Sequence, residues 1–567
     1  MPLGILLVRL PGAHAGVRGV TWGRRDSEGG GLRERGRTII VAPPCLPMHI
    51  PLDALRLTPR ATPVMLTTLL SFSLALAVQQ LPPRQTDADT KAWWKLTSVL
   101  SADSMEGRDT GSPGYQRAAN VVAHRLAAAG VKPLGDQGSW FQSVPMEEVR
   151  IATASIHVGS RTLDFLRDIT TSATVPESVG GALVYRGYCG ADALGDVRGK
   201  LVVCHATRRE GLPSDQDRRA ALTKAGAAGM IAIADPGFTI EPPRWPFAYV
   251  RSVSLAGPAP ARRGGNGTLT AFTLNAAALG KVIAGSGQNA ESLIERGSAG
   301  RPLPSFDIPD QLRATFTTTR RSLASPNVVG ILPGTDPALA DQAIVLSAHL
   351  DGYGYGEPVK GDSLYNGTLD DAAYVALIVR LAERREGKGF KRPIIFAIVT
   401  GEEKGLNGSR WFVSHLPVPK ERIAGNINLD QLRPLFPLDL LTVHALDDTS
   451  LGDDARAVAT SLGIQVQNDP EPERNLLRRS DHWTFMQAGI PAVNFVFGFK
   501  PGTESERIYR RWYREGYHTP QDDLAQRIDW NAASKFNRFF YGLVERVADA
   551  GQPPEWKAGS TLRPKGE

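Results

Sequence analysis

Three short apolar runs in the C-terminal half of the chain each end beside a histidine or an acidic residue. They are residues 343–348 before His349, residues 393–400 before Glu402 and Glu403, and residues 423–429 before Asp430. Short, continuous apolar runs are typical of parallel strands that are buried on both faces. In open α/β sheets the functional residues lie just beyond the carboxyl ends of such strands. The sequence therefore predicts an α/β fold in which these polar residues meet at one edge of a sheet.

Helical patterns alternate with these runs between residues 327 and about 549. The predicted helices are 371–385, 481–488 and a last one that begins at Trp530. Strands that alternate with helices favour a largely parallel sheet with helices on both of its faces.

The residue types between His349 and His518 indicate a site for two divalent cations. Two zinc ions about 3.5–4 Å apart need a shared carboxylate, nitrogen and oxygen ligands on either side, and an open edge for a water molecule. His349 and Asp430 can serve one ion. Glu403 and His518 can serve the other, with an aspartate between the two ions. The predicted cofactor is therefore a pair of zinc ions.

Two further residues have supporting tasks in this interpretation. Neighbouring side chains diverge on an extended segment, so Glu402 can act as a general base on the water while Glu403 faces an ion. Asp351 lies two residues beyond His349 and can accept the second ring N–H, which fixes the tautomer and orientation of that ligand.

Five short motifs in this region resemble, in the same order, those of the co-catalytic two-zinc exopeptidases, the family of bacterial zinc aminopeptidases and of glutamate carboxypeptidase. The matching stretches are S-A-H-L-D (347–351), G-E-E-K-G-L-N-G-S (401–409), N-L-D (428–430), S-D-H (480–482) with G-I-P (489–491), and Y-H-T-P (517–520). The resemblance implies a zinc exopeptidase fold and the hydrolysis of peptides. The metal ligands that it implies are His349, Asp371, Glu403, Asp430 and His518. It also implies that Glu402 is the general base and that Tyr517 donates to the oxyanion.

The segment around the bridging aspartate departs from the family pattern. The usual pattern is D-D-N followed by small residues, with the ligand just before the asparagine, whereas this chain has Asp370, Asp371 and then A-A-Tyr374. We predict Asp371 as the bridge, with Asp370 as the alternative. Loss of the asparagine removes a side-chain hydrogen bond, and Tyr374 replaces a small residue, so the site could be tightened or its metal affinity changed.

The S-D-H motif adds Asp481 and His482 as candidate substrate contacts. An alternative is that Asp481 only caps the helix that begins there.

Three other functions remain open. A carboxypeptidase could grip a substrate carboxylate with the basic residues near the motif loops, which are Arg433, Arg474, Arg478 and Arg479. A degenerate peptidase could only bind peptides, and a glutaminyl cyclase would use a single zinc. The chain has no H-E-x-x-H, G-x-S-x-G, G-x-x-x-x-G-K-[ST] or C-x-x-C motif, so other protease, serine-hydrolase, P-loop and thiol-redox readings have no support.

The N-terminal residues 1–77 indicate targeting. Residues 64–78 are apolar, follow Arg56 and Arg60, and end in a small-x-small signal-peptidase site at residues 75–77. As a helix this run spans roughly 22 Å, less than the ~30 Å hydrocarbon core, so a cleaved signal is favoured over a stable membrane anchor. We therefore predict an exported protein, periplasmic or secreted.

Charge and cysteine content agree with export. The net charge of +7 falls to about +2 without residues 1–77, which hold nine arginines and four acids, so a nucleic-acid partner is not indicated. Cys189 and Cys204 then remain as an even pair and predict a disulfide, with two buried free thiols as the alternative.

The mature chain is predicted to have three blocks and a tail. Residues 90–149 resemble the N-terminal helices of the peptidase fold, residues 319–550 form the zinc peptidase domain, and residues 551–567 are a loose C-terminal tail. Residues 150–318 resemble an inserted, β-rich protease-associated domain, because L-G-D-V-R-G-K (194–200) precedes an apolar strand and K-A-G-A-A-G-M-I-A-I follows at 224–233. Such domains act as lids or substrate-selecting modules, the alternative being an inert spacer.

Overall fold

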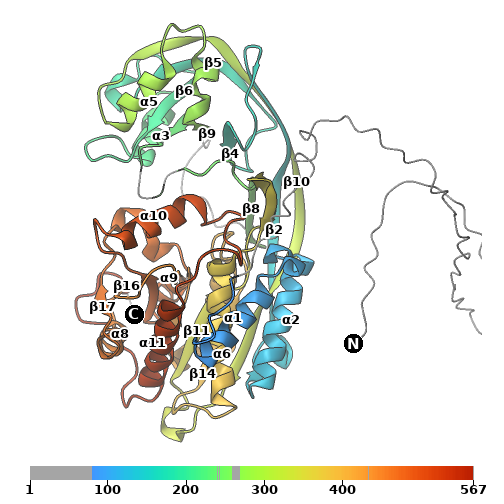
Figure 1. The fold of residues 1–567 in the computed structure, drawn as a ribbon. Coiled ribbons are helices and arrows are strands. Elements are labelled where there is room, and N and C mark those ends of the chain that lie inside the picture. The colour runs from blue at the N-terminus through green and yellow to red at the C-terminus, as the bar shows by residue number, and fades with distance from the viewer. Residues whose placement is uncertain (1–79, 239–240, 242, 258–268, 432, 566–567) are drawn as a thin grey trace, which may run out of the picture. The chain divides into compact units, whose positions relative to one another are not determined.

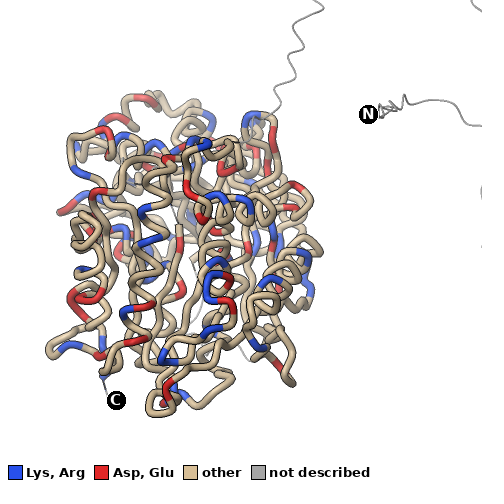
Figure 2. The backbone as a smooth tube through the Cα atoms, turned by 60° about the horizontal axis from the view of Figure 1, so that its bottom comes forward, with Lys and Arg blue, Asp and Glu red and all other residues tan. Residues whose placement is uncertain are grey.

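The computed structural model describes residues 80–238, 241, 243–257, 269–431 and 433–565. The predicted signal peptide and its cleavage site lie outside these residues. Among the described helices, none combines the length and apolar character needed to cross a bilayer. Figure 2 shows that basic and acidic residues are interspersed along the described chain in that view.

Parallel strands form the centre of the sheet in the C-terminal half (Figure 1). β14 (Ile394–Val399), β11 (Ala343–His349), β15 (Ile423–Asn428) and β18 (Ala492–Phe497) lie side by side in this order, all parallel. The three apolar runs are therefore strands, as the sequence predicts. Because parallel strands present their carboxyl ends at one edge, the residues that follow them are brought together.

Antiparallel strands complete the sheet on both sides. Beyond β18 lie β16 (Leu440–His444), which is antiparallel to β18, and β17 (Gln465–Gln467), which is parallel to β16. On the other side, β10 (Ser305–Leu332) is antiparallel to β14 and also pairs with β1 (Lys132–Pro133). The predicted fold class is confirmed as a largely parallel, mixed sheet.

Alternate side chains of the central strands enter two separate cores. Ile344 and Leu346 of β11 belong to one core, and Val345 between them belongs to the other. The helices that contribute to the first core are α1 (Ala88–Leu100), α2 (Pro113–Ala128), α6 (Ala373–Arg385), α8 (Ser450–Ser461), α10 (Glu504–Glu515) and α11 (Trp530–Ala548). The second core receives α7 (Asn407–Ser414) and α9 (His482–Gln487). Helices therefore cover both faces, which is why most residues of these strands are apolar.

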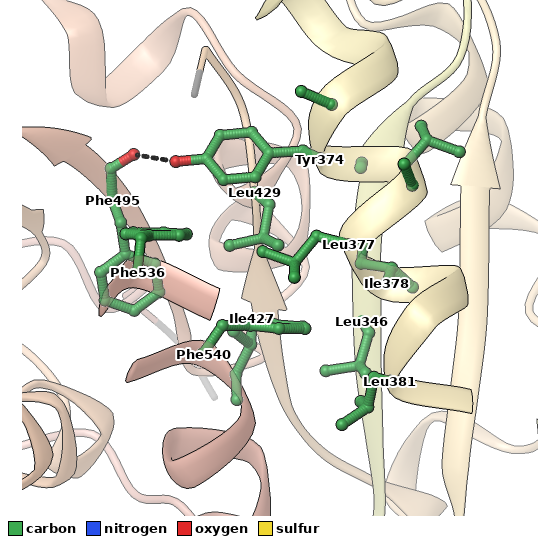
Figure 3. Close-up of a cluster of buried hydrophobic side chains, with 14 of the residues drawn as sticks. Leu346, Tyr374, Leu377, Ile378, Leu381, Ile427, Leu429, Phe495, Phe536 and Phe540 are labelled. Carbon is green, nitrogen blue, oxygen red and sulfur yellow. Dashed lines mark hydrogen bonds between the residues drawn. The ribbon is translucent and has the colours of Figure 1, made fainter. Parts of the chain in front are cut away.

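Tyr374 in the first turn of α6 belongs to the first core and not to the candidate site. Its ring lies 5.5 Å from that of Phe536 in α11, and its hydroxyl donates to the backbone carbonyl of Phe495 at 3.5 Å (Figure 3). The side chain is fully buried among these residues. The expectation that Tyr374 tightens the metal site is therefore wrong.

Two long antiparallel strands connect the N-terminal half of the sheet to the C-terminal half. β2 (Phe141–Val158) pairs with β10 along its whole length, and the predicted domain limits at 150 and 318 fall inside these two strands. The remaining strands of this half are β3 (Arg161–Thr162), β4 (Ile169–Thr171), β5 (Ser178–Arg186), β6 (Leu201–Ala206), β7 (Gly229–Ala234), β8 (Arg251–Leu255) and β9 (Thr270–Asn275). Its helices are α3 (Asp215–Lys224), α4 (Leu279–Ile283) and α5 (Ala290–Ser298). A protease-associated domain in this part of the chain remains a prediction.

The two cysteines and the C-terminal residues both have defined positions in the structure. A disulfide joins Cys189 to Cys204, in a small core of the N-terminal half. Residues 551–565 are not loose: Trp556 Nε1 donates to the carbonyl of Gly489 at 2.8 Å, and Lys557 N donates to the carbonyl of Asp448 at 2.8 Å. The expectation of a loose tail is wrong because this tryptophan packs against the second core.

Candidate active site

The candidate site lies where several elements of the C-terminal half end. His349 is the last residue of β11, Glu402 and Glu403 follow β14, and Asp430 follows β15. A turn at Thr368–Ala372 before α6 supplies a fourth acidic residue, and the loop after α10 (Glu504–Glu515) supplies His518. The strand ends thus hold most of the site, and two loops complete it.

The first group of possible metal ligands is His349, Asp370 and Asp430, whose ligand atoms all lie within 4.8 Å of one another. The Nε2 atom of His349 lies 3.3 Å from Asp370 Oδ1 and 3.7 Å from Asp430 Oδ1. All three residues are buried. One nitrogen and two carboxylates in this arrangement can hold a zinc ion.

The second group is Asp370, Glu403 and His518. His518 Nε2 lies 3.1 Å from Glu403 Oε2 and 3.2 Å from Asp370 Oδ2. The two oxygens of Asp370 therefore face different histidines, one in each group. This is the arrangement that a carboxylate shared by two cations requires.

The structure corrects the choice of bridging aspartate. Asp371 turns its Oδ2 atom toward the backbone N–H of His349, from which it accepts a hydrogen bond at 3.2 Å. It belongs to neither group of possible ligands, whereas Asp370 belongs to both. Asp371 is therefore in the wrong position to bridge two ions, and Asp370 is the candidate bridge.

Glu402 lies beside the first group and is more exposed than Glu403. Its Oε2 atom is 3.9 Å from His349 Nε2, and its side chain is 10% exposed, compared with 4% for Glu403. Burial raises the pKa of Glu402 well above its ordinary value, and the carboxylates of Asp430 and Glu403 raise it further against the opposing effect of His349. A carboxylate with a raised pKa at the open side of the cluster suits a general base.

The second ring nitrogen of each histidine is also held. His349 Nδ1 donates to the backbone carbonyl of Asp351 at 3.0 Å, and the carboxylate of Asp351 is farther away, at 3.8 Å. That carboxylate instead accepts from Glu402 N at 3.0 Å and from the Thr110 hydroxyl at 3.0 Å. Asp351 is thus the right residue for orienting His349, but the sequence-based choice of its carboxylate was wrong, because the chain turns there and presents the carbonyl.

Two residues that the sequence analysis missed complete the surroundings. The hydroxyl of Tyr353 hydrogen-bonds to His518 Nδ1 at 2.9 Å. Asp522 accepts from the backbone N–H groups of Leu369 and Asp370, both at 3.0 Å, and burial raises its pKa to about 7. Asp522 lies four residues beyond His518 in the sequence, which is the signal that could have drawn attention to it.

The residues present fit two divalent cations. Asp370 Oδ2 and Asp430 Oδ1 are buried and have no hydrogen-bond partner. Leaving such charged oxygens without partners is costly unless cations compensate them. Imidazole nitrogens and carboxylate oxygens in two groups that share Asp370 are the donor set that zinc accepts.

Tyr517 lies directly beside the second group. Its ring stacks on that of His518 with centroids 3.6 Å apart. Its hydroxyl accepts hydrogen bonds from Gln431 Nε2 at 3.1 Å and from Arg479 Nη2 at 3.5 Å. The hydroxyl proton is not used in either bond, and the role of Tyr517 as an oxyanion donor stays a prediction.

Asp481 and His482 are both buried. The Asp481 carboxylate accepts from the Ser409 hydroxyl and makes no cap for α9, which excludes the capping alternative. The ring of His482 stacks near that of His444, at a centroid distance of 5.6 Å, and belongs to neither ligand group. A direct substrate contact by His482 is not supported, because its ring is enclosed in the core.

The four basic residues of the carboxypeptidase alternative lie in different surroundings. Arg433 is buried against the rings of Trp512 and Tyr513, and Arg474 is buried and paired with Glu471 at 3.2 Å. Arg478 lies over the ring of Trp483. Of the four, Arg479 alone lines the cavity that also contains His518.

Comparison with known proteins identifies the part of the chain that carries this site. Residues 327–544 match the model of peptidase family M28. This part of the chain is similar to the peptidases of family M28. Together with the two groups of possible metal ligands, this match makes the protein an enzyme, a metallopeptidase.

Two relatives are similar in sequence. Leupeptin-inactivating enzyme 1 of Streptomyces exfoliatus is 26% identical over 351 residues, which cover 59% of this chain and 72% of the relative. Aminopeptidase YwaD of Bacillus subtilis is 26% identical over 204 residues, which cover 35% of this chain and 40% of the relative.

One solved structure extends the likeness of the fold. The aminopeptidase from Aneurinibacillus sp. strain AM-1 superposes with a TM-score of 0.54 at 19% identity, covering 82% of this chain and 95% of that chain. At this identity the likeness concerns the fold, and it includes the N-terminal half of the described chain as well as the part that matches family M28.

Proposed function

We propose that the protein is an exported aminopeptidase that uses two zinc ions bridged by Asp370. The observation that carries the proposal is the position of the Asp370 carboxylate, with one oxygen 3.3 Å from His349 Nε2 and the other 3.2 Å from His518 Nε2. Asp430 would complete one site and Glu403 the other. The aminopeptidases among the similar proteins support the reaction.

In the proposed reaction, bound zinc ions would lower the pKa of a water molecule and polarise the peptide carbonyl. Glu402 takes a proton from this water and returns it to the leaving amine, for which its position beside His349 is suited. The Tyr517 hydroxyl, whose oxygen already accepts from Gln431 and Arg479, donates a hydrogen bond to the developing oxyanion.

An excess of acidic residues supports a free amine as the recognised end of the substrate. Glu403 and Asp430 are proposed zinc ligands and Glu402 lies beside them, so a free α-amine can bind a zinc ion or pair with an acidic side chain of this cluster. An acylated amine can do neither, because it carries no charge and its nitrogen is a poor ligand, a loss of about 1–3 kcal/mol.

This choice can be tested with blocked peptides. We expect a peptide with a free N-terminus to lose its first residue and its N-acetylated form to remain intact. Mass spectrometry of the products after equal incubation measures both outcomes. A carboxypeptidase would instead cleave the acetylated peptide and spare one with an amidated C-terminus, and that result would overturn the aminopeptidase proposal.

Export and the inserted domain belong to the same proposal. Export rests on the apolar run at residues 64–78 and its cleavage motif. The disulfide between Cys189 and Cys204 supports it, because disulfides persist in oxidising compartments. The segment at 150–318 is proposed to be a protease-associated domain that helps to select substrates.

A further inference from the structure

A cavity of about 390 Å³ opens beside the second group of possible metal ligands. His518, Tyr353 and Arg479 line it from the peptidase domain. Arg208, Glu241 and Arg244 line it from the N-terminal half, with two prolines, Phe247 and Ala248 between them. Because His518 is part of the wall, a substrate at the site has a side chain or backbone group within reach of this cavity.

The one acidic side chain in the wall is already paired. Glu241 accepts hydrogen bonds from Arg479 at 2.7 and 3.2 Å, and Arg474 Nε lies 3.7 Å from it. Burial would raise the pKa of Glu241, but these arginines lower it to about 2, so it is ionised and its charge is matched. Glu241 is one carboxylate that faces Arg479, Arg474 and, at 3.8 Å, Arg244, so the positive charges around it outnumber its single negative charge.

Arg244 lies between the cavity and the reacting groups. Its guanidinium carbon is 4.7 Å from the centre of the Tyr517 ring, and that ring stacks on His518. Its contacts with oxygen are long: 3.8 Å to Glu241 Oε1 and 3.4 Å to the carbonyl of Tyr513. Most of its hydrogen-bonding capacity is thus available to a ligand.

Arg208 supplies a second cation at the mouth of the cavity. It is exposed, lies 4.9 Å from the centre of the Phe238 ring, and has no ion pair among the residues that the structure describes. Two guanidinium groups with spare donors in one concave wall form a site that suits a carboxylate.

We infer that this cavity binds a carboxylate of the peptide substrate through Arg244 and Arg208, so that the enzyme prefers peptides that carry a negative charge near the cleaved bond. The inference rests on the proposed peptidase function and specifies its substrate class. The carboxylate comes either from an acidic side chain or from the C-terminus of a short peptide. Both sources present the same chemistry to the two arginines.

Three peptides separate these sources: Glu-Ala-Ala-amide, Gln-Ala-Ala-amide and Gln-Ala-Ala with a free C-terminus. The kcat/KM values of the metal-loaded enzyme give two ratios. The side-chain ratio compares Glu-Ala-Ala-amide with Gln-Ala-Ala-amide. The C-terminal ratio compares Gln-Ala-Ala with a free C-terminus with Gln-Ala-Ala-amide. We expect one of these ratios to exceed 1 for the wild type. It should fall by about tenfold or more in Arg244→Gln and by a smaller factor in Arg208→Gln.

Because Arg244 also touches Tyr517, the ratio and not the absolute rate is the readout. Arg244→Lys keeps the charge and should restore part of the ratio, and high salt should lower it in the wild type. Arg209→Gln is the matched control, since Arg209 donates to the carbonyl of Ser298 and does not line the cavity, and its ratio should not change.

The outcomes are distinct. A fall in the side-chain ratio assigns the cavity to acidic residues, and a fall in the C-terminal ratio assigns it to short peptides. Ratios that stay unchanged in both Arg244→Gln and Arg208→Gln overturn the inference while leaving the proposed function intact. If the wild type releases the first residue from none of the three peptides, the proposed function itself is contradicted, and the inference fails with it.

Discussion

The Glu402→Gln enzyme should keep both zinc ions and lose about 10²- to 10⁴-fold in kcat. Glutamine has nearly the same shape as glutamate but cannot take a proton from the attacking water. Glu402 lies near His349 and Glu403 in a third possible group, but both groups that share Asp370 are complete without it, so the metal content should remain that of the wild type. Steady-state kinetics and elemental analysis of the same preparation measure the two quantities.

A suitable control for Glu402→Gln is Glu357→Gln. Glu357 is in the hairpin strand β12 (Gly354–Val359) and forms an ion pair with Arg167 at 2.6 Å, outside the candidate ligand groups. This variant should retain wild-type kcat. Activity of Glu402→Gln within tenfold of the wild type would contradict the assignment of the base.

The second large effect concerns the bridge, and we expect Asp370→Asn to lose at least one zinc ion per chain together with its activity. A neutral amide has one oxygen in place of two and no charge, so it cannot serve both ions. Asp371→Asn is the matched variant. Its amide oxygen can still accept from the N–H of His349, so it should bind zinc more fully than Asp370→Asn.

Elemental analysis of both aspartate variants after dialysis against a weak chelator measures this difference. The opposite pattern, with two zinc ions in Asp370→Asn and fewer in Asp371→Asn, would restore Asp371 as the bridge. Circular dichroism should show that both variants are folded, because each replaces a buried carboxylate by an amide of the same size.

The sequence predicts the strands of the site well because their burial determines their composition. β11, β14 and β15 contact cores on both sides, so most of their residues are apolar. The polar residues Ser347, Asn426 and Asn428 inside the strands are buried and hydrogen-bonded to one another.

Most of the histidine and acidic residues that can bind metal lie at the ends of these strands, so their chemical types can be predicted from the sequence. His349 lies 3.7 Å from Asp430 and His518 lies 3.1 Å from Glu403, and the division of these residues between two ions stays a prediction.

Neighbouring residues on an irregular turn are harder to tell apart. Asp370 and Asp371 differ by one position in a segment with non-helical dihedral angles, so neither period nor spacing says which side chain faces the histidines. The backbone carbonyl of Asp351 is likewise a group that no residue type reveals.

Contacts between residues that are far apart in the chain could not be predicted from the sequence either. Tyr353 and Asp522 reach the site from separate loops, and Tyr374 enters the core because Phe495 and Phe536 leave room for it there. The continuity of β2 and β10 across the predicted domain limits depends on their pairing with each other.

The most direct test of the proposal is a zinc titration of the chelated protein, with release of the N-terminal residue from a free peptide as the readout. The account predicts that the initial rate rises with added zinc and reaches its plateau at two ions per chain. A plateau at one ion per chain, or release that persists without any metal, would contradict the two-zinc site centred on Asp370.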